Sequence, residues 1–106
     1  MEFDVKIYSR DVKGIGGSLF GWEHKSIVID HHAHGYIVIE WVKPGLYIYE
    51  TNCYKFGRVG LCDKILREKV KLSKVIETAQ DICRGRKYSL RKFNCNHFVQ
   101  VMENWL

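Results

Sequence analysis

Two runs of β-branched residues joined by a short polar segment constrain the fold most strongly. Residues 24–29 (His-Lys-Ser-Ile-Val-Ile) and residues 35–42 (Gly-Tyr-Ile-Val-Ile-Glu-Trp-Val) are both typical of a β-strand. Residues 30–34 form the predicted turn between them. The sequence therefore predicts an antiparallel hairpin at the centre of the domain.

The flanking segments extend this hairpin into a predicted meander. Residues 2–8 alternate polar and apolar side chains, as a half-buried strand does. Residues 46–50 form a further predicted strand after the turn at Pro44 and Gly45, and residues 55–59 are a candidate short strand. We expect a sheet of about four to five strands.

Helical periodicity appears only in the last third of the chain. Apolar residues recur at helical spacing from Leu72 to Cys83, and a second predicted helix begins near Cys95. Strands first and helices last indicate an α+β fold, with an antiparallel β-meander packed against two to three helices. The length of 106 residues fits a single domain covering residues 1–106.

Four cysteines bear on the compartment: Cys53, Cys62, Cys83 and Cys95. They form no Cys-x-x-Cys pair, and no apolar leader precedes them, so we expect free thiols in a reducing, cytoplasmic setting. No apolar run approaches the roughly 20 residues of a membrane-spanning helix. The protein could still touch a membrane from one side.

Basic residues exceed acidic ones and are densest in residues 84–92. The formal net charge is +5, and this segment contains Arg84, Arg86, Lys87, Arg91 and Lys92. Such a run is usually a solvated face. Its functional interpretation is a weak contact with an anionic membrane surface or an acidic protein, and we expect no specific nucleic acid partner.

Cys95 is the candidate nucleophile. It precedes a helical pattern between Asn94 and Asn96, so its sulfur would meet the positive end of a helix dipole, which lowers a thiol pKa. Amide groups in that first turn could donate to a developing oxyanion. The alternative is a buried structural cysteine. His97 faces away, because two residues along a helix is a rotation of about 200°, so we expect it to support the site from behind.

His24 is the candidate base. If Asp30 pairs with His34, His24 lies opposite Glu40, which could orient the imidazole; a turn altered by one residue would bring Trp41 there instead. The alternative is a surface histidine paired with a surface glutamate. Other apolar and aromatic residues, namely Phe20, Trp22 and Tyr36, are the predicted lining of a substrate cleft.

No cofactor or metal is expected. His31, His32 and His34 cluster in the predicted turn and could be considered as zinc ligands. A flexible turn offers no fixed fourth ligand, so these histidines are more often ordinary polar turn residues. Gly14, Gly16 and Gly17 precede Phe20 and Trp22 without the other positions of a phosphate-binding loop.

The histidine strand and residues 93–98 (Phe-Asn-Cys-Asn-His-Phe) together resemble the circularly permuted papain-like, or NlpC-like, thiol hydrolases, in which the histidine precedes the cysteine. The likeness extends to two branches: the PPPDE isopeptidases and the lecithin:retinol acyltransferase-like proteins with their H-box and NC motif. Some proteins of positive-strand RNA viruses carry the same H-box/NC pair, and host-cell cytoplasm would then be the location. The acyltransferase branch usually has a histidine where this chain has Glu40, so the branch stays open.

The resemblance implies a cysteine-dependent hydrolase or acyltransferase. Cys95 would be the nucleophile, His24 the base, and Glu40 the third member, with Asn94, Asn96 and His97 as support. The substrate would be an acyl-bearing molecule, either a protein conjugate or a phospholipid, and the residues do not separate amide from ester. The alternative function is a non-catalytic H-box/NC-type binding or regulatory module that retains the fold.

Overall fold

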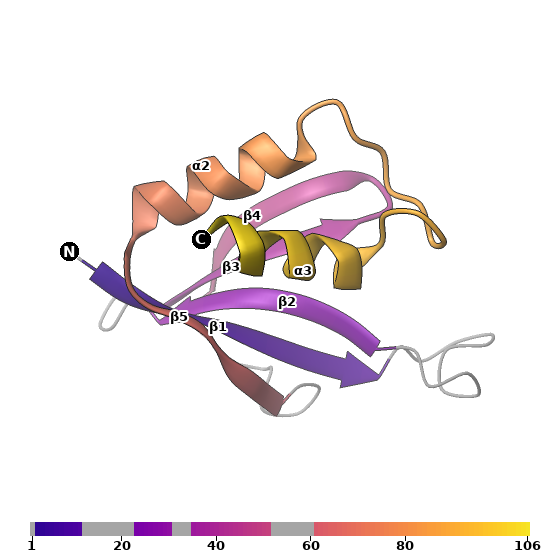
Figure 1. The fold of residues 1–106 in the computed structure, drawn as a ribbon. Helices are drawn as coiled ribbons and strands as arrows, with labels where there is room; N and C mark the ends of the chain where they lie inside the picture. The colour runs from indigo at the N-terminus through magenta and orange to yellow at the C-terminus, as the bar shows by residue number, and fades with distance from the viewer. Residues whose placement is uncertain (1, 12–22, 31–34, 52–60) are drawn as a thin grey trace.

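The computed structural model describes residues 2–11, 23–30, 35–51 and 61–106 (Figure 1). The side chains of residues 9–11, 23 and 61–64 lie outside this description. The described elements are, in chain order, β1 (Glu2–Asp11), β2 (Glu23–Asp30), β3 (Tyr36–Val42), β4 (Gly45–Thr51), β5 (Leu61–Lys71), α2 (Leu72–Cys83) and α3 (Cys95–Trp105).

The five strands form one antiparallel sheet in the order β4-β3-β2-β1-β5. Strands β1 to β4 make the predicted meander, and β5 returns to pair with β1 at the opposite edge. The expected α+β class and strand number are confirmed. The predicted short strand at residues 55–59 lies outside the described residues.

Strand β5 was not among the predicted strands. Its sequence, Leu-Cys-Asp-Lys-Ile-Leu-Arg-Glu-Lys-Val-Lys, is dominated by charged residues and lacks a clean period of two. Its pairing with β1 is interrupted by three register shifts, and Lys69 has a φ of 55°. Charges and bulges are typical of edge strands, because they discourage further strand addition.

The predicted register of β2 and β3 was wrong by two residues. Asp30 pairs with Tyr36 and Ile27 with Ile39, so His24 is not directly opposite Glu40. The connection between the strands is longer than the turn assumed. Because side chains alternate with a period of two, a two-residue shift keeps both residues on the same face, whereas the register with Trp41 would have separated them.

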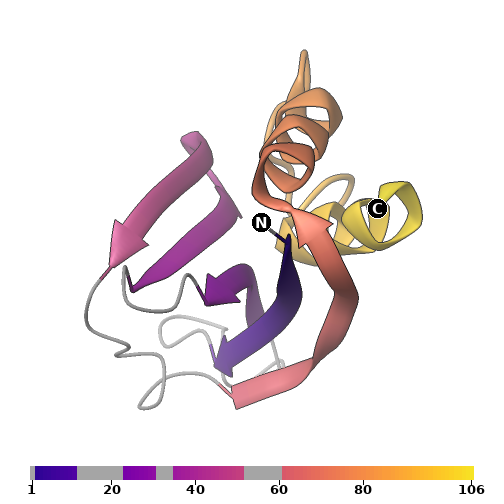
Figure 2. The ribbon, with the colours of Figure 1, turned by 90° about the vertical axis from the view of Figure 1, so that its left-hand side faces the viewer.

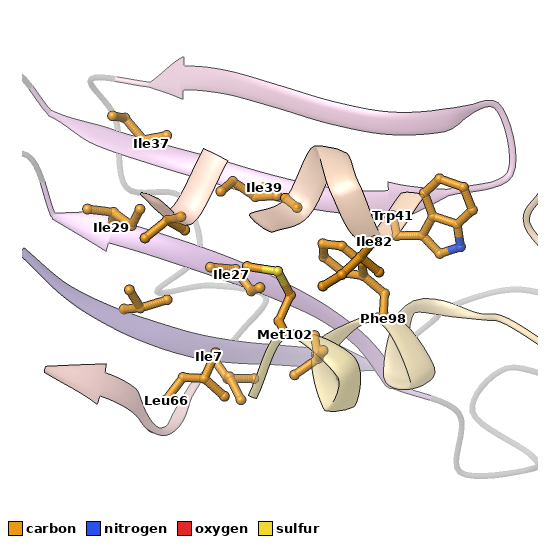
Figure 3. Packing of buried hydrophobic residues seen from close by; sticks show 14 of the residues in the cluster. Ile7, Ile27, Ile29, Ile37, Ile39, Trp41, Leu66, Ile82, Phe98 and Met102 are labelled. Atoms are coloured by element: carbon orange, nitrogen blue, oxygen red, sulfur yellow. The ribbon is translucent and has the colours of Figure 1, made fainter. Parts of the chain in front are cut away.

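Both helices lie on one face of the curved sheet (Figures 1 and 2). Helix α3 packs against β2, the central strand, and α2 lies beside α3. The isoleucines of β2 and β3 form the core with Phe98 and Met102 from α3 (Figure 3). This core fixes where α3 begins relative to β2, and the N-terminal end of α3 is where Cys95 is located.

Trp41 connects the sheet to the chain just before α3. Its ring packs against Phe98 at a centroid distance of 6.4 Å, and its indole N–H donates to the Phe93 carbonyl oxygen at 3.0 Å. The Arg86 guanidinium lies 4.6 Å from the centroid of the Phe93 ring. Trp41 therefore holds the segment before α3 from the core side, and Arg86 holds it from the solvent side.

Within the described residues, neither helix is long and apolar enough to cross a membrane.

Candidate active site

The start of α3 is held by a reciprocal set of hydrogen bonds. The Asn94 side-chain oxygen accepts from the N–H of Asn96 at 2.9 Å and of His97 at 3.2 Å. The Asn94 N–H donates to Nδ1 of His97 at 3.0 Å, which completes a capping box. This cap fixes the backbone of the first turn, and therefore the position of the Cys95 side chain.

The segment before the cap is equally constrained. Ser89 and Phe93 exchange two backbone hydrogen bonds of 3.0 and 2.9 Å. The Asn94 side-chain amide donates to the Leu90 carbonyl oxygen at 2.9 Å. The small polar residues of the motif thus fold into a tight loop whose last residue caps the helix.

The Cys95 thiol is buried, with an exposed fraction of 5%, and it meets strand β2. It is hydrogen-bonded to the His24 side chain and to the N–H groups of Lys25 and Asn96. The ladder between β2 and β3 runs from Ile27 to Asp30 on β2, so the thiol meets β2 beyond the end of this ladder. The structure therefore brings the two principal predicted residues into contact.

Glu40 lies on the other side of the His24 ring. Its Oε1 is 3.2 Å from Nε2 of His24, and the Ser26 hydroxyl donates to the same oxygen at 2.8 Å. The side chains of His24 and Glu40 are only 12% and 11% exposed. Cys95, His24 and Glu40 thus form a continuous row, and Ser26, on the strand that carries His24, holds the carboxylate.

The electrostatics of the row favour a charged pair. The pKa of His24 is raised to about 9, mainly by its hydrogen bond with Cys95 and then by that with Glu40, against the effect of burial. Burial is the largest influence on Cys95 and acts to raise its pKa. The hydrogen bonds and charge of His24, with the N–H groups of Lys25 and Asn96, outweigh burial and lower the pKa. An imidazolium and a thiolate therefore stabilise each other here.

Tyr88 lies close enough to Cys95 to feel its charge, although it was not among the predicted site residues. Its pKa is raised, first by burial and then by the negative charge of Cys95. Its ring lies 6.3 Å from that of Trp41. The raised pKa keeps the phenol protonated. No periodicity marks this residue, since it lies in the loop between α2 and α3.

An open hollow of about 330 Å³ lies against α3, next to residues that flank the thiol; Cys95 itself is not among its lining residues. The lining includes Lys25 and Asn96, whose N–H groups contact the sulfur, together with Asn94 and His97. No local sequence pattern marks this hollow, because its walls come from β1, β2 and α3.

The structure places Asn94, Asn96 and His97 in the helix cap, where the N–H groups of Asn96 and His97 donate to the Asn94 side-chain oxygen. The use of first-turn amides for an oxyanion stays a prediction.

Of the three predicted cleft residues, the structure describes only Tyr36, which lies away from the site. Tyr36 pairs with Asp30 and lies four residues before Glu40 along β3, about 13 Å at the usual strand rise. Phe20 and Trp22 lie outside the described residues, as do His31, His32 and His34. Among the residues that the structure does describe, no three His, Cys, Asp or Glu side chains gather closely enough to hold a metal ion.

No protein-family model matches the chain, and neither the curated proteins nor the solved structures include a match.

Proposed function

We propose that this protein is a cysteine-dependent hydrolase or acyltransferase that works through an acyl-cysteine intermediate. One observation carries the proposal: the buried row in which Cys95 contacts His24 and His24 contacts Glu40. A thiolate is the reactive form of cysteine, and a neighbouring imidazolium at a helix N-terminus is the usual means of producing it near neutral pH.

In this proposal each residue of the row has one role in the reaction. Nε2 of His24 faces Glu40, so Nδ1 is the nitrogen that would exchange a proton with the Cys95 sulfur. The thiolate attacks an acyl carbon, and a sulfur–carbon bond forms as the bond to the leaving group breaks. The imidazolium gives its proton to the leaving group. The neutral ring then accepts a proton from the incoming water or alcohol, whose oxygen bonds to the acyl carbon as the sulfur–carbon bond breaks, and this restores the thiolate and the imidazolium.

Glu40 would keep the ring oriented and stabilise its charged form. The carboxylate is itself fixed by Ser26, so its negative charge stays next to Nε2. Glu40 would thus be the third member of a catalytic triad, the residue that orients the histidine.

The order of the parts supports the permuted papain-like interpretation of the fold. The histidine strand β2 comes before the cysteine helix α3, and the two meet at the site. A thiolate mechanism requires a reduced sulfur, so we place the activity in the cytoplasm. An acyl-bearing protein conjugate or phospholipid would be the substrate, and the basic segment at residues 84–92 could add a weak attraction to an anionic membrane surface.

The test is direct capture of the intermediate. The protein is mixed with p-nitrophenyl acetate, and we expect a burst of nitrophenolate together with an acetyl group mapped to Cys95 by peptide mass spectrometry. Neutral hydroxylamine should release that acetyl group, because it forms a thioester. The Cys83→Ser variant should behave like the parent.

Acetylation spread evenly over several thiols, or none at Cys95, would contradict the proposal. The chain would then be better described as a non-catalytic binding module that keeps the fold.

A further inference from the structure

The hollow beside the thiol has a composition that bears on the substrate. Its wall on α3 carries Asn96 and Gln100, which are four residues apart and so share one helix face. Lys25 faces them from β2, and Glu103 continues the wall one turn further along α3. The hollow thus presents amide donors, amide acceptors and both signs of charge.

The lining of the hollow is more polar than apolar. Ile7 and Val99 also line it, but they are only 2% and 4% exposed. A hydrocarbon chain placed here would cover Asn96, Gln100 and Lys25 without replacing their hydrogen bonds to water, which is costly for each group. A chain with its own amide groups would replace those bonds.

The spacing of the two amide side chains fits an extended peptide. Four residues along a helix advance about 6 Å. Two residues along an extended chain advance about 6.6 to 7.2 Å. The side chains of Asn96 and Gln100 can therefore bind backbone groups that lie two residues apart in one extended peptide. Asn96 is the one nearer the nucleophile, because its N–H contacts the Cys95 sulfur.

We infer that this hollow is a subsite for an extended, peptide-like chain, and that Gln100 is a specificity-determining residue within it. The inference rests on the proposed function and deepens it, because it selects an amide-bearing protein substrate over a fatty acyl lipid. Lys25 and Asn96 border the nucleophile, whereas Gln100 lies one helical turn away and contacts only the bound chain.

The test compares two alkylating probes of similar length, iodoacetyl-Ala-Ala-amide and N-hexyl iodoacetamide. In both, the Cys95 thiolate displaces iodide, so that a carbon–sulfur bond forms and the carbon–iodine bond breaks. The rate at Cys95 is followed by peptide mass spectrometry and divided by the rate with plain iodoacetamide for the same variant. This ratio removes differences in thiol reactivity.

We expect the peptide probe to exceed the hexyl probe at Cys95. Gln100→Leu should reduce the peptide ratio about fivefold, the worth of one hydrogen bond, and raise the hexyl ratio. Gln80→Leu is the matched control, because Gln80 is an exposed glutamine on the other helix, and it should leave both ratios unchanged.

A faster hexyl probe, or a peptide preference that survives Gln100→Leu, would overturn the subsite. The rates are read at Cys95 alone, so this outcome is independent of acyl-cysteine formation. A Cys95 that prefers the peptide probe but is never acetylated would instead remove the proposed function.

Discussion

Cys83 and Cys95 both lie at helix ends, yet their thiol pKa values are shifted in opposite directions. Cys83 is the last residue of α2, and burial raises its pKa to about 11, while the charge of Arg86 opposes the shift. Cys95 is the first residue of α3, and its pKa is lowered although burial acts on it in the same sense. Burial alone therefore gives an inert thiol, and the donors around the sulfur make the difference.

The N-terminal ends of α2 and α3 also differ in their hydrogen bonding. Lys71 precedes α2 without any side-chain cap, whereas Asn94 caps α3 and receives the reciprocal bond to His97. Helix α2 is held by packing through Val75, Ala79 and Ile82. The extra hydrogen bonding is found where the position of one sulfur atom has to be fixed.

The largest effect should come from removing the two sulfurs in turn. Cys95→Ser should abolish acyl transfer, by at least about 10³-fold, because the hydroxyl is a far weaker nucleophile without a matched base. Cys83→Ser should leave the rate unchanged. Turnover with p-nitrophenyl acetate measures both, and thermal unfolding serves as the folding control. Unfolding of the Cys95→Ser variant would indicate a structural cysteine instead.

Glu40→Gln should narrow the pH profile from both sides. The imidazolium of His24 persists below its pKa of about 9 and is lost as the pH rises through that value. Without the carboxylate charge the pKa of His24 falls, so the alkaline limb of the pH–rate profile shifts to lower pH. The pKa of Cys95 rises, so the acidic limb shifts to higher pH. A shift of one pKa unit changes the thiolate fraction about tenfold on the acidic limb.

The pH–rate profile measures this effect. Glu50→Gln, at an exposed position on β4, provides the matched control. An unchanged profile in the Glu40→Gln variant would remove Glu40 from the mechanism and leave Cys95 and His24 in place.

Substitutions of His97 should separate helix capping from thiol activation. Gln and Glu can both accept from the Asn94 N–H, whereas Ala cannot and should cost about 0.5 to 2 kcal/mol of stability. His97→Glu adds a negative charge near the sulfur and should raise the Cys95 pKa while preserving stability. His97→Gln should leave both close to the parent.

Urea unfolding and thiol titration together measure these two properties. If all three variants changed the Cys95 pKa in proportion to their loss of stability, His97 would have no role beyond folding.

The smallest effect should come from giving α2 the cap that it lacks. Lys71→Asp places a side-chain acceptor and a negative charge at the N-terminus of that helix, where the backbone is already extended. We expect a gain of about 0.5 to 1 kcal/mol in the free energy of unfolding, with no change in the Cys95 pKa. A large change in thiol reactivity would show that the two helix starts are coupled.

The sequence predicted which residues meet at the candidate site better than the strand register that brings them together. The alternation in β2 and β3 placed His24 and Glu40 on one face, and that conclusion survived a two-residue register error because the period of a strand is two. The error itself came from the length of the connection, which composition does not determine. The charged strand β5 was not predicted, because it has no local strand pattern and is a strand only through its pairing with β1.

Features made by distant segments were not predictable from the sequence. The Ser26 hydroxyl donates to Glu40 across two strands, and no local pattern indicates this contact. The proximity of Tyr88 to Cys95, and the hollow between α3 and β2, depend on how the layers pack. Such contacts follow from tertiary structure, which a single sequence specifies only through the whole fold.

The most direct test of the central claim is the pH dependence of iodoacetamide labelling at Cys83 and Cys95, measured separately by peptide mass spectrometry on the native protein. The contrast between the two thiols predicts that Cys95 is labelled at mildly acidic pH, and that Cys83 reacts only in alkaline solution, as its pKa of about 11 requires. Two thiols that titrate together, or a Cys83 that reacts first, would contradict the claim that the start of α3 activates Cys95.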